Sequence, residues 1–244
     1  MGNLTDAVKH LLIINVLVFV ATQIYGDQMY VWLSLWYPEH PNFEWWQIIS
    51  HMFMHGSFMH ILFNMYGLWA FGTPLERMWG RNKFLFFYFS AGLGAALLHT
   101  SVNYYVFNQG VQALVNSSVS ESQVLEIISQ GQYSPSWNDM IGKETVDSFL
   151  SAFNTPAVGA SGAIYGVLVA FAFAYSEAEL MLIFLPIPIK AKYFVPLLIV
   201  GDLFFGFTGT ATGIAHFAHI GGAITGFIMM WYWKKNQFNN NRWN

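Results

Sequence analysis

The sequence predicts an all-α membrane protein in which six transmembrane helices form one bundle. Three observations lead to this prediction: the composition, the length of the apolar segments and the distribution of the basic residues. Of the 244 residues, 55% are hydrophobic and only 9% are charged, whereas a typical soluble domain has about 25% charged residues. The apolar residues occur in long blocks, which is the pattern expected of segments that cross a bilayer.

A helix needs about 20 mostly apolar residues to cross a bilayer, and six blocks of the sequence approach this length. Two long polar stretches, 26–56 and 106–158, interrupt the blocks and are expected to be outer loops of a single membrane domain that covers residues 1–244. The six expected spans are residues 7–25, 58–72, 83–105, 161–184, 193–207 and 214–233.

The basic residues test this layout independently, because Lys and Arg are enriched in the cytoplasmic loops of membrane proteins. Six crossings put both termini on one side, together with the loops 73–82 and 185–192. Of the 10 basic residues, only Lys143 falls on the opposite side. We therefore expect both termini to be cytoplasmic. The basic residues on that side are Lys9, Arg77, Arg81, Lys83, Lys190, Lys192, Lys234, Lys235 and Arg242.

Composition also excludes some classes of protein. The chain has no Cys, so it has neither disulfides nor thiolate metal sites. Its net charge of −3 gives no support for nucleic-acid binding. The apolar run 11–21 lacks the strongly basic start and the small-residue cleavage site of a signal peptide, so we expect it to be retained as the first helix.

Four tryptophans in the first outer segment are typical of a membrane interface, where their amphipathic rings suit the headgroup region. They leave two alternatives open. The segment either is partly embedded and packs against the helices, or it is an ordinary interfacial anchor. These residues are Trp32, Trp36, Trp45 and Trp46.

Polar residues within the expected spans are candidates for a functional site, because they are costly in a bilayer. At a helical rise of about 1.5 Å per residue, four of them, from three different spans, fall within roughly 10 Å of one depth below the outer surface. These four are His60, Asn64, Ser161 and His219. The remaining polar residues of interest are His99, Asp202 and His216.

Ser161 is the candidate nucleophile. It is expected to open the fourth span, where free backbone N–H groups and the helix dipole favour an alkoxide and an oxyanion. Gly159 and Gly162 would let a substrate backbone approach. However, Ser is also a common helix N-cap, and Gly162 with Gly166 is a common packing pattern. The soluble G-x-S-x-G motif is not met, so the local sequence alone also allows a structural role.

His219 is the candidate general base, because a serine hydroxyl needs a base to remove its proton. Beyond it, Gly222 and Gly226 form a smooth helix face that would let the sixth span press against the glycine face of the fourth. Asp202 lies near the outer end of the fifth span and is not expected to complete a triad. We therefore expect a serine–histidine dyad, with the ring of Tyr165 stacked on the imidazole.

His60 and Asn64 are spaced i, i+4 and therefore share one helix face. Both side chains can donate hydrogen bonds, and with the Ser161 backbone N–H they would form an oxyanion hole. Their alternative role is to bond the backbone of an outer loop.

A metal site is the rival chemistry. The H-E-x-x-H pattern is absent, since Met52 stands in the position of the acid, and no carboxylate nearby would complete a catalytic zinc site. We therefore expect no metal. The imidazoles weighed for this role are those of His51, His55 and His60, or of His216 with His219.

These motifs resemble those of the rhomboid proteases, in the same order and over nearly the whole chain. Residues 55–64 (HGSFMHILFN) look like the second-helix signature of the family, and 159–162 (GASG) like its nucleophile motif. Residues 218–222 (AHIGG) are similar to its catalytic histidine motif, and 76–80 (ERMWG) to an element that recurs after the second helix. The segment 106–158 departs from the family pattern, because it is longer than in a basic six-helix rhomboid.

The resemblance implies a cofactor-free intramembrane serine endopeptidase that cuts the transmembrane segments of other membrane proteins within the lipid membrane. The fifth span and the loop 206–213 would form its gate. The implied site residues are catalytic Ser161 and His219, oxyanion-binding His60 and Asn64, and supporting Tyr165, Gly159 and Gly162.

We expect an integral multi-pass protein of the bacterial inner membrane. The alternative is a non-catalytic rhomboid-like scaffold that binds transmembrane partners without cutting them. A transporter is disfavoured, because the sequence has no internal repeat.

Overall fold

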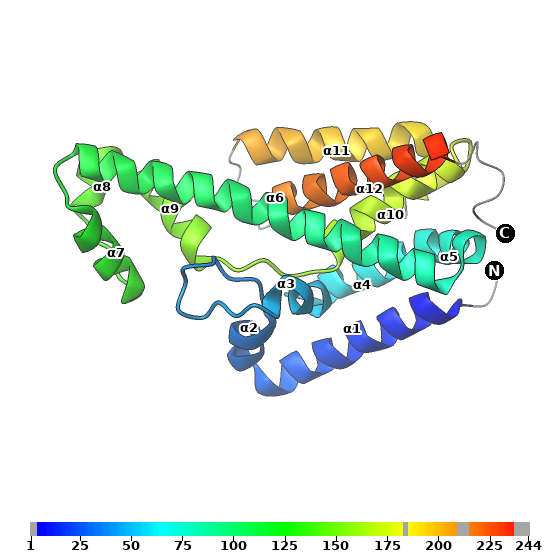
Figure 1. The fold of residues 1–244 in the computed structure, drawn as a ribbon, viewed down its shortest axis with the longest axis horizontal. Coiled ribbons are helices and arrows are strands. Elements are labelled where there is room, and N and C mark those ends of the chain that lie inside the picture. Colours follow the sequence, from blue (N-terminus) through cyan, green and yellow to red (C-terminus); the bar gives the residue numbers. More distant parts are fainter. Residues whose placement is uncertain (1–3, 183–184, 209–214, 237–244) are drawn as a thin grey trace.

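The computed structural model describes residues 4–182, 185–208 and 215–236, which form a helical bundle with one short β-hairpin (Figure 1). In the bundle, α12 contacts α6, α10 and α11, while α1 contacts α4 and α6. The elements are α1 (Asp6–Tyr25), α2 (Asp27–Leu33), α3 (Gln47–Ser50), the 3-10 helix η1 (His51–Phe53), α4 (Phe58–Gly67), the π-helix η2 (Leu68–Gly72), α5 (Thr73–Trp79), α6 (Arg81–Asn116), α7 (Glu121–Ser129), α8 (Trp137–Ile141), α9 (Lys143–Asn154), α10 (Ser161–Ala174), β1 (Glu179–Leu182), β2 (Leu185–Lys190), α11 (Ala191–Thr208) and α12 (His216–Asn236).

The helical membrane bundle predicted from the sequence is confirmed. Within the described residues, α1, α6 and α11 are long and apolar enough to cross a membrane, and α10 is a shorter apolar helix. The expected span 58–72 is helical as α4 and η2, and α12 covers the described part of 214–233. The number of six crossings stays a prediction. Most of the expected gate loop, 206–213, lies outside the described residues.

The fourth expected span is wrong at its inner end. α10 ends at Ala174, and the residues that follow form an antiparallel hairpin in which Glu179 of β1 pairs with Lys190 of β2. Pro188 of β2 lacks the backbone N–H that a helix uses and so disfavours a helix through this strand.

A polar turn joins α10 to the hairpin. The carboxylate of Glu177 forms salt bridges with Lys190 (2.7 Å) and Lys192 (2.5 Å). These hydrogen bonds lower the pKa of Glu177 to about 2. The group is exposed and charged, as expected for the end of the bundle that faces water.

The second outer segment, 106–158, is largely helical. α6 continues through its first part, and α7, α8 and α9 pack against the outer half of α6 at the far end of the molecule (Figure 1). Although the segment is polar in composition, it contains apolar residues at helical spacing. They form a second hydrophobic core that is separate from the main one. The largest buried residues of this core are Tyr37, Phe107, Trp137, Phe149 and Phe153.

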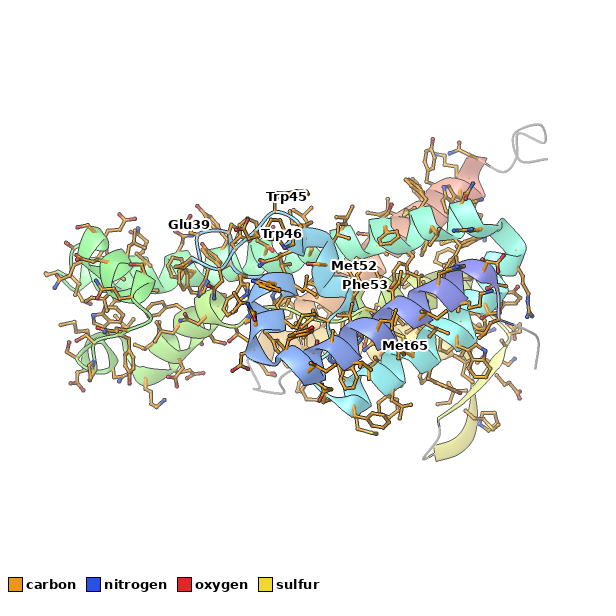
Figure 2. All side chains as sticks on the ribbon, turned by 90° about the horizontal axis from the view of Figure 1, so that it is seen from below. Glu39, Trp45, Trp46, Met52, Phe53 and Met65 are labelled. Atoms are coloured by element: carbon orange, nitrogen blue, oxygen red, sulfur yellow. The ribbon has the colours of Figure 1, made fainter. Side chains whose placement is uncertain are left out.

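The first outer segment, 26–56, is ordered and packs against the bundle, as one of the two alternatives requires. The buried side chain of Gln47 donates hydrogen bonds to the carbonyls of Val31 (3.0 Å) and Asn42 (2.8 Å) and so closes the segment on itself. α3 contacts α6. Trp45 and Trp46 lie on the outer edge of this segment (Figure 2), and Trp45 is 75% exposed.

Glu76 fixes the position of α1 relative to α5. Its carboxylate accepts hydrogen bonds from the backbone N–H groups of Ala7 (2.8 Å) and Val8 (2.9 Å) in the first turn of α1. These N–H groups have no partner within their own helix, and the helix dipole favours a negative charge at this end. The contact gives a structural reason for the acid in the motif 76–80.

The glycine faces of α10 and α12 are in direct backbone contact, as the sequence predicts. A Cβ at Gly222 would lie 1.8 Å from the carbonyl oxygen of Gly162, and one at Gly226 would lie 2.7 Å from the Cα of Gly166. Small residues at helix interfaces permit such close approach in membranes. This contact determines how near the first turns of α10 and α12 come to each other.

We expect Gly222→Ala to force α10 and α12 apart, because the added methyl group would overlap backbone atoms that cannot rotate away. Overpacking of this kind costs about 1–3 kcal/mol or more. The thermal unfolding temperature of the purified protein in detergent should therefore fall by several degrees. Gly201→Ala is the matched control, since a Cβ at Gly201 meets no atom within 4 Å. Equal unfolding temperatures for the two variants would contradict the proposed contact.

We also expect Glu76→Gln to destabilise the fold by about 1–3 kcal/mol, because a buried carboxylate that accepts two backbone hydrogen bonds is replaced by a neutral amide. The measurement is the midpoint of chemical unfolding in micelles. Glu44→Gln replaces an exposed acid and should leave the midpoint unchanged. A Glu76 variant as stable as the Glu44 variant would show that the cap is unimportant.

Candidate active site

Backbone hydrogen bonds fix the segment that leads into α10. The N–H of Gly159 donates to the carbonyl of His51 (2.9 Å), and Leu35 and Ala157 exchange two hydrogen bonds of 2.9 Å. Gly159 has φ +121°, and a Cβ there would lie 2.7 Å from Nε2 of His60. Only glycine fits this conformation and this contact. The first residue of α10 is therefore held in a defined place beside the first outer segment.

That first residue is Ser161, and the structure brings its hydroxyl to His219. Oγ of Ser161 lies 2.8 Å from Nε2 of His219, which is in the first turns of α12. The ring of Tyr165, one turn along α10, stacks on the imidazole with a centroid distance of 4.2 Å and an interplanar angle of 12°. His219 is 9% exposed. These three residues thus occupy the arrangement expected from the sequence.

His60 reaches this site from α4. The backbone N–H of Gly56 donates to Nδ1 of His60 (3.4 Å), so in this tautomer Nε2 carries the proton. Nε2 is also the ring atom that lies against Gly159, two residues before Ser161. His60 therefore directs a hydrogen-bond donor toward the start of α10.

Asn64 lies one turn further along the same face of α4 and is buried. One of its two amide N–H groups is used within the helix, because Nδ2 donates to the carbonyl of His60 (2.8 Å). The second N–H remains available for another acceptor. The Asn64 amide therefore retains one donor that could bind a negatively charged oxygen.

The expectation that Asp202 is out of reach of the histidine is wrong. Oδ1 of Asp202, on α11, lies 3.1 Å from Nδ1 of His219 and 2.5 Å from Nδ1 of His216. Asp202 is 6% exposed, and its side chain also interacts with that of Tyr165. The packing of α11 against α12 brings these groups together, although Asp202 is 14 residues from His216 and 17 from His219 in the sequence.

Asp202, His216 and His219 also form a group of potential metal ligands. The ligand atoms of Asp202, His216 and His219 lie within 4.8 Å of one another, so this set has the composition of a carboxylate–imidazole metal site. The sequence interpretation paired His216 with His219 but found no nearby carboxylate, and Asp202 supplies one. In the structure these atoms are hydrogen-bonded to one another.

A small cavity of about 20 Å³ lies beside Ser161. Its lining includes His51, His99 and Gly159. His99, which the sequence identifies as a polar residue within a span, lies 3.1 Å from the amide nitrogen of Asn103. The cavity is large enough for one water molecule and has polar groups that could hold it.

Comparison with known proteins connects this site to a family. A family model described as Rhomboid domain matches residues 42–125 and 138–236. The chain is 28% identical over 188 residues to rhomboid protease AarA of Providencia stuartii, which covers 76% of this chain and 55% of AarA. It is 40% identical over 74 residues to rhomboid protease GlpG of Klebsiella pneumoniae, which covers 30% of this chain and 27% of GlpG. The chain thus spans about half, or about a quarter, of the length of these relatives.

The matched regions include every residue of the Ser161–His219–Asp202 group, and also His60 and Asn64. The family model extends over well more than half of the chain, and the two relatives are both named as rhomboid proteases. Together with the helical membrane bundle, these matches establish that the chain belongs to the rhomboid family.

Proposed function

We propose that this protein is an intramembrane serine endopeptidase in which Ser161 is the nucleophile and His219 the general base. The observation that carries the proposal is the 2.8 Å contact between Ser161 Oγ and His219 Nε2. A nucleophile within hydrogen-bond reach of a base, with the base oriented by a further group, is the arrangement that nucleophilic catalysis requires. Here both the stacked ring of Tyr165 and a hydrogen bond to Nδ1 orient the base.

The reaction begins when His219 takes the proton of Ser161 and the serine oxygen attacks a peptide carbonyl carbon of the substrate. The carbonyl oxygen becomes negatively charged in the tetrahedral intermediate. His219 then gives its proton to the leaving amine, and an ester between the substrate and Ser161 remains. In the second half, His219 takes a proton from a water molecule, which attacks the ester carbonyl carbon. The bond to Ser161 Oγ then breaks, His219 returns the proton to this oxygen, and the new carboxyl end is released.

Three donors are available for the negatively charged oxygen. They are Nε2–H of His60, the second amide N–H of Asn64 and the backbone N–H of Ser161 at the start of α10. The helix dipole of α10 favours negative charge at the same point. Donors that are already oriented stabilise the transition state without reorganisation.

The cavity beside Ser161 would supply the water for the second half of the reaction. Water is scarce within a bilayer, so a site that cuts peptide bonds there needs a place to hold it. The cavity contacts Ser161 and is lined in part by His51 and His99. A water molecule held there would lie next to the ester.

The substrates would be transmembrane segments of other membrane proteins, which enter from the surrounding lipid. Their helices must unwind locally, because a helical peptide bond is shielded by its own hydrogen bonds. We also propose the multi-pass topology with both termini in the cytoplasm. In its support, α1 begins and α12 ends at the same end of the bundle, where the α5–α6 turn also lies (Figure 1).

We expect Ser161→Ala to abolish cleavage of tagged single-span substrates by the purified protein in liposomes, because the nucleophile is removed. Gel analysis with mass spectrometry of the products should locate the cuts in the outer part of the substrate helix for the wild type alone. Ser101→Ala is the matched control, since Ser101 is an exposed helical serine that bonds only its own backbone at Leu97 (2.7 Å).

Cleavage by the Ser161 variant at the wild-type rate would identify a different nucleophile. If neither protein cuts any substrate while both remain folded, the endopeptidase proposal fails in favour of the scaffold alternative.

We expect Asn64→Ala to lower kcat by about 10²–10³ with little change in KM, because removal of one oxyanion donor acts on the transition state. Asn108→Ala is a close control: Asn108 makes the same hydrogen bond to the carbonyl four residues earlier, at Tyr104 (2.7 Å), but lies exposed on α6. An unchanged kcat for the Asn64 variant would remove this residue from the oxyanion site.

A further inference from the structure

Asp202 is a buried carboxylate in a helix whose other residues are mostly apolar. The residues of α11 that are buried in the structure are Ala191, Val195 and Asp202, and the first two lie near its inner end. In the outer half of the described helix, Asp202 is therefore the buried side chain. Burial of a charged group in a membrane is costly unless it is paired, so its partners indicate why it is there.

The partners are the catalytic imidazole and groups that surround it. Nδ1 of His219 and Nδ1 of His216 both lie within hydrogen-bond distance of the same oxygen of Asp202, and Tyr165 also interacts with this carboxylate. A carboxylate accepts hydrogen bonds and donates none. The proton in the contact with His219 therefore belongs to Nδ1.

The position of this proton decides what Nε2 can do. A neutral imidazole that carries its proton on Nδ1 has a free electron pair on Nε2. Nε2 is the atom that faces Ser161 Oγ at 2.8 Å, so it can accept the serine proton. With the proton on Nε2 instead, the imidazole could only donate to the serine oxygen and could not act as its base.

We propose that Asp202 is a positioning residue for the reaction: it holds His219 in the tautomer and orientation that accept the proton of Ser161, so that the dyad works as a triad whose third member comes from α11. This inference rests on the proposed endopeptidase function. It also links the chemistry to the fold, because any movement of the outer half of α11 away from α12 withdraws the carboxylate from His219. His216, which shares the carboxylate, holds Asp202 in place.

Asp202→Asn is the decisive substitution, because it keeps the shape of the side chain but offers an N–H that favours the other tautomer. We expect kcat for a cleaved substrate to fall at least about tenfold, with KM within about twofold; loss of the acid from a soluble serine-protease triad lowers kcat by about 10⁴. A kcat within twofold of wild type, in a variant with unchanged unfolding temperature, would overturn the proposal.

Nitrogen-15 NMR of ring-labelled histidine in micelles provides a readout that needs no turnover. The His219 signals are assigned by their loss in His219→Asn. We expect Nδ1 of His219 to be protonated in the wild type and Nε2 in Asp202→Asn. The same tautomer in both proteins would overturn the proposal, whatever the cleavage results.

Val195→Ala separates positioning from helix docking. This change weakens the apolar packing of α11 near its inner end but leaves the Asp202 carboxylate. We expect the wild-type tautomer and a kcat close to wild type. If Val195→Ala reproduces both effects of Asp202→Asn, they arise from loosened packing and the positioning role is wrong. Since the spectra do not depend on cleavage, failure of the endopeptidase proposal would be recognised separately, by a wild type that cuts nothing.

Discussion

α10 and α12 approach each other so closely that a Cβ at Gly222 would lie 1.8 Å from the backbone oxygen of Gly162. Lipid provides no hydrophobic force to press helices together, so their contact depends on close packing of small residues and on interhelical hydrogen bonds. The glycine contact begins at Gly162, the residue after Ser161, and at Gly222, about one turn beyond His219. It therefore fixes the separation of the two helices where these side chains meet, at 2.8 Å. Tyr165 stacks on the His219 imidazole and Asp202 accepts its hydrogen bond. Both contacts require the position that the glycine contact gives to this ring.

The polar groups of the site divide into two sets. On one side of the imidazole, Asp202 and His216 are hydrogen-bonded to each other, which lowers the free-energy cost of burying them in the bilayer. On the other side, near the start of α10, are Nε2–H of His60 and the Asn64 amide, which are the proposed donors to the carbonyl oxygen. In this arrangement, the groups on the Asp202 side are paired without substrate. The His60 and Asn64 donors would gain their hydrogen bonds only when charge develops on the substrate carbonyl. That difference is what selective stabilisation of a transition state requires.

Much of this could be predicted from the sequence, because short motifs on apolar segments determine local features. The helix start at Ser161 and the glycine faces follow from residue spacing, and the stacked Tyr165 follows from the family resemblance. Asp202 could not be assigned in this way, since its contact with His219 depends on how α11 rotates and slides against α12. The signal available in the sequence was an acidic residue within an apolar span, because such a group needs a partner in the bilayer. The helices of the outer segment could not be assigned for a different reason. Val124 and Ile128 in α7, and Phe149 and Phe153 in α9, lie at helical spacing within a polar composition, and their common core exists only when α7 and α9 pack against α6.

The hydrogen bonds of Asp202 serve two purposes that are separate in soluble hydrolases. A soluble enzyme attaches its helices largely by burying apolar area, and the polar residues of its site are then free to serve the chemistry alone. In the outer half of α11, the large apolar side chains of Val200 and Phe204 are exposed on the surface that lipid would cover. The contact between this part of α11 and α12 includes the carboxylate–imidazole bonds together with the ring contacts Phe205–His216 and Phe207–Phe217. In the proposed mechanism the same bonds orient His219, so a movement of α11 away from α12 would also change the orientation of the proposed base.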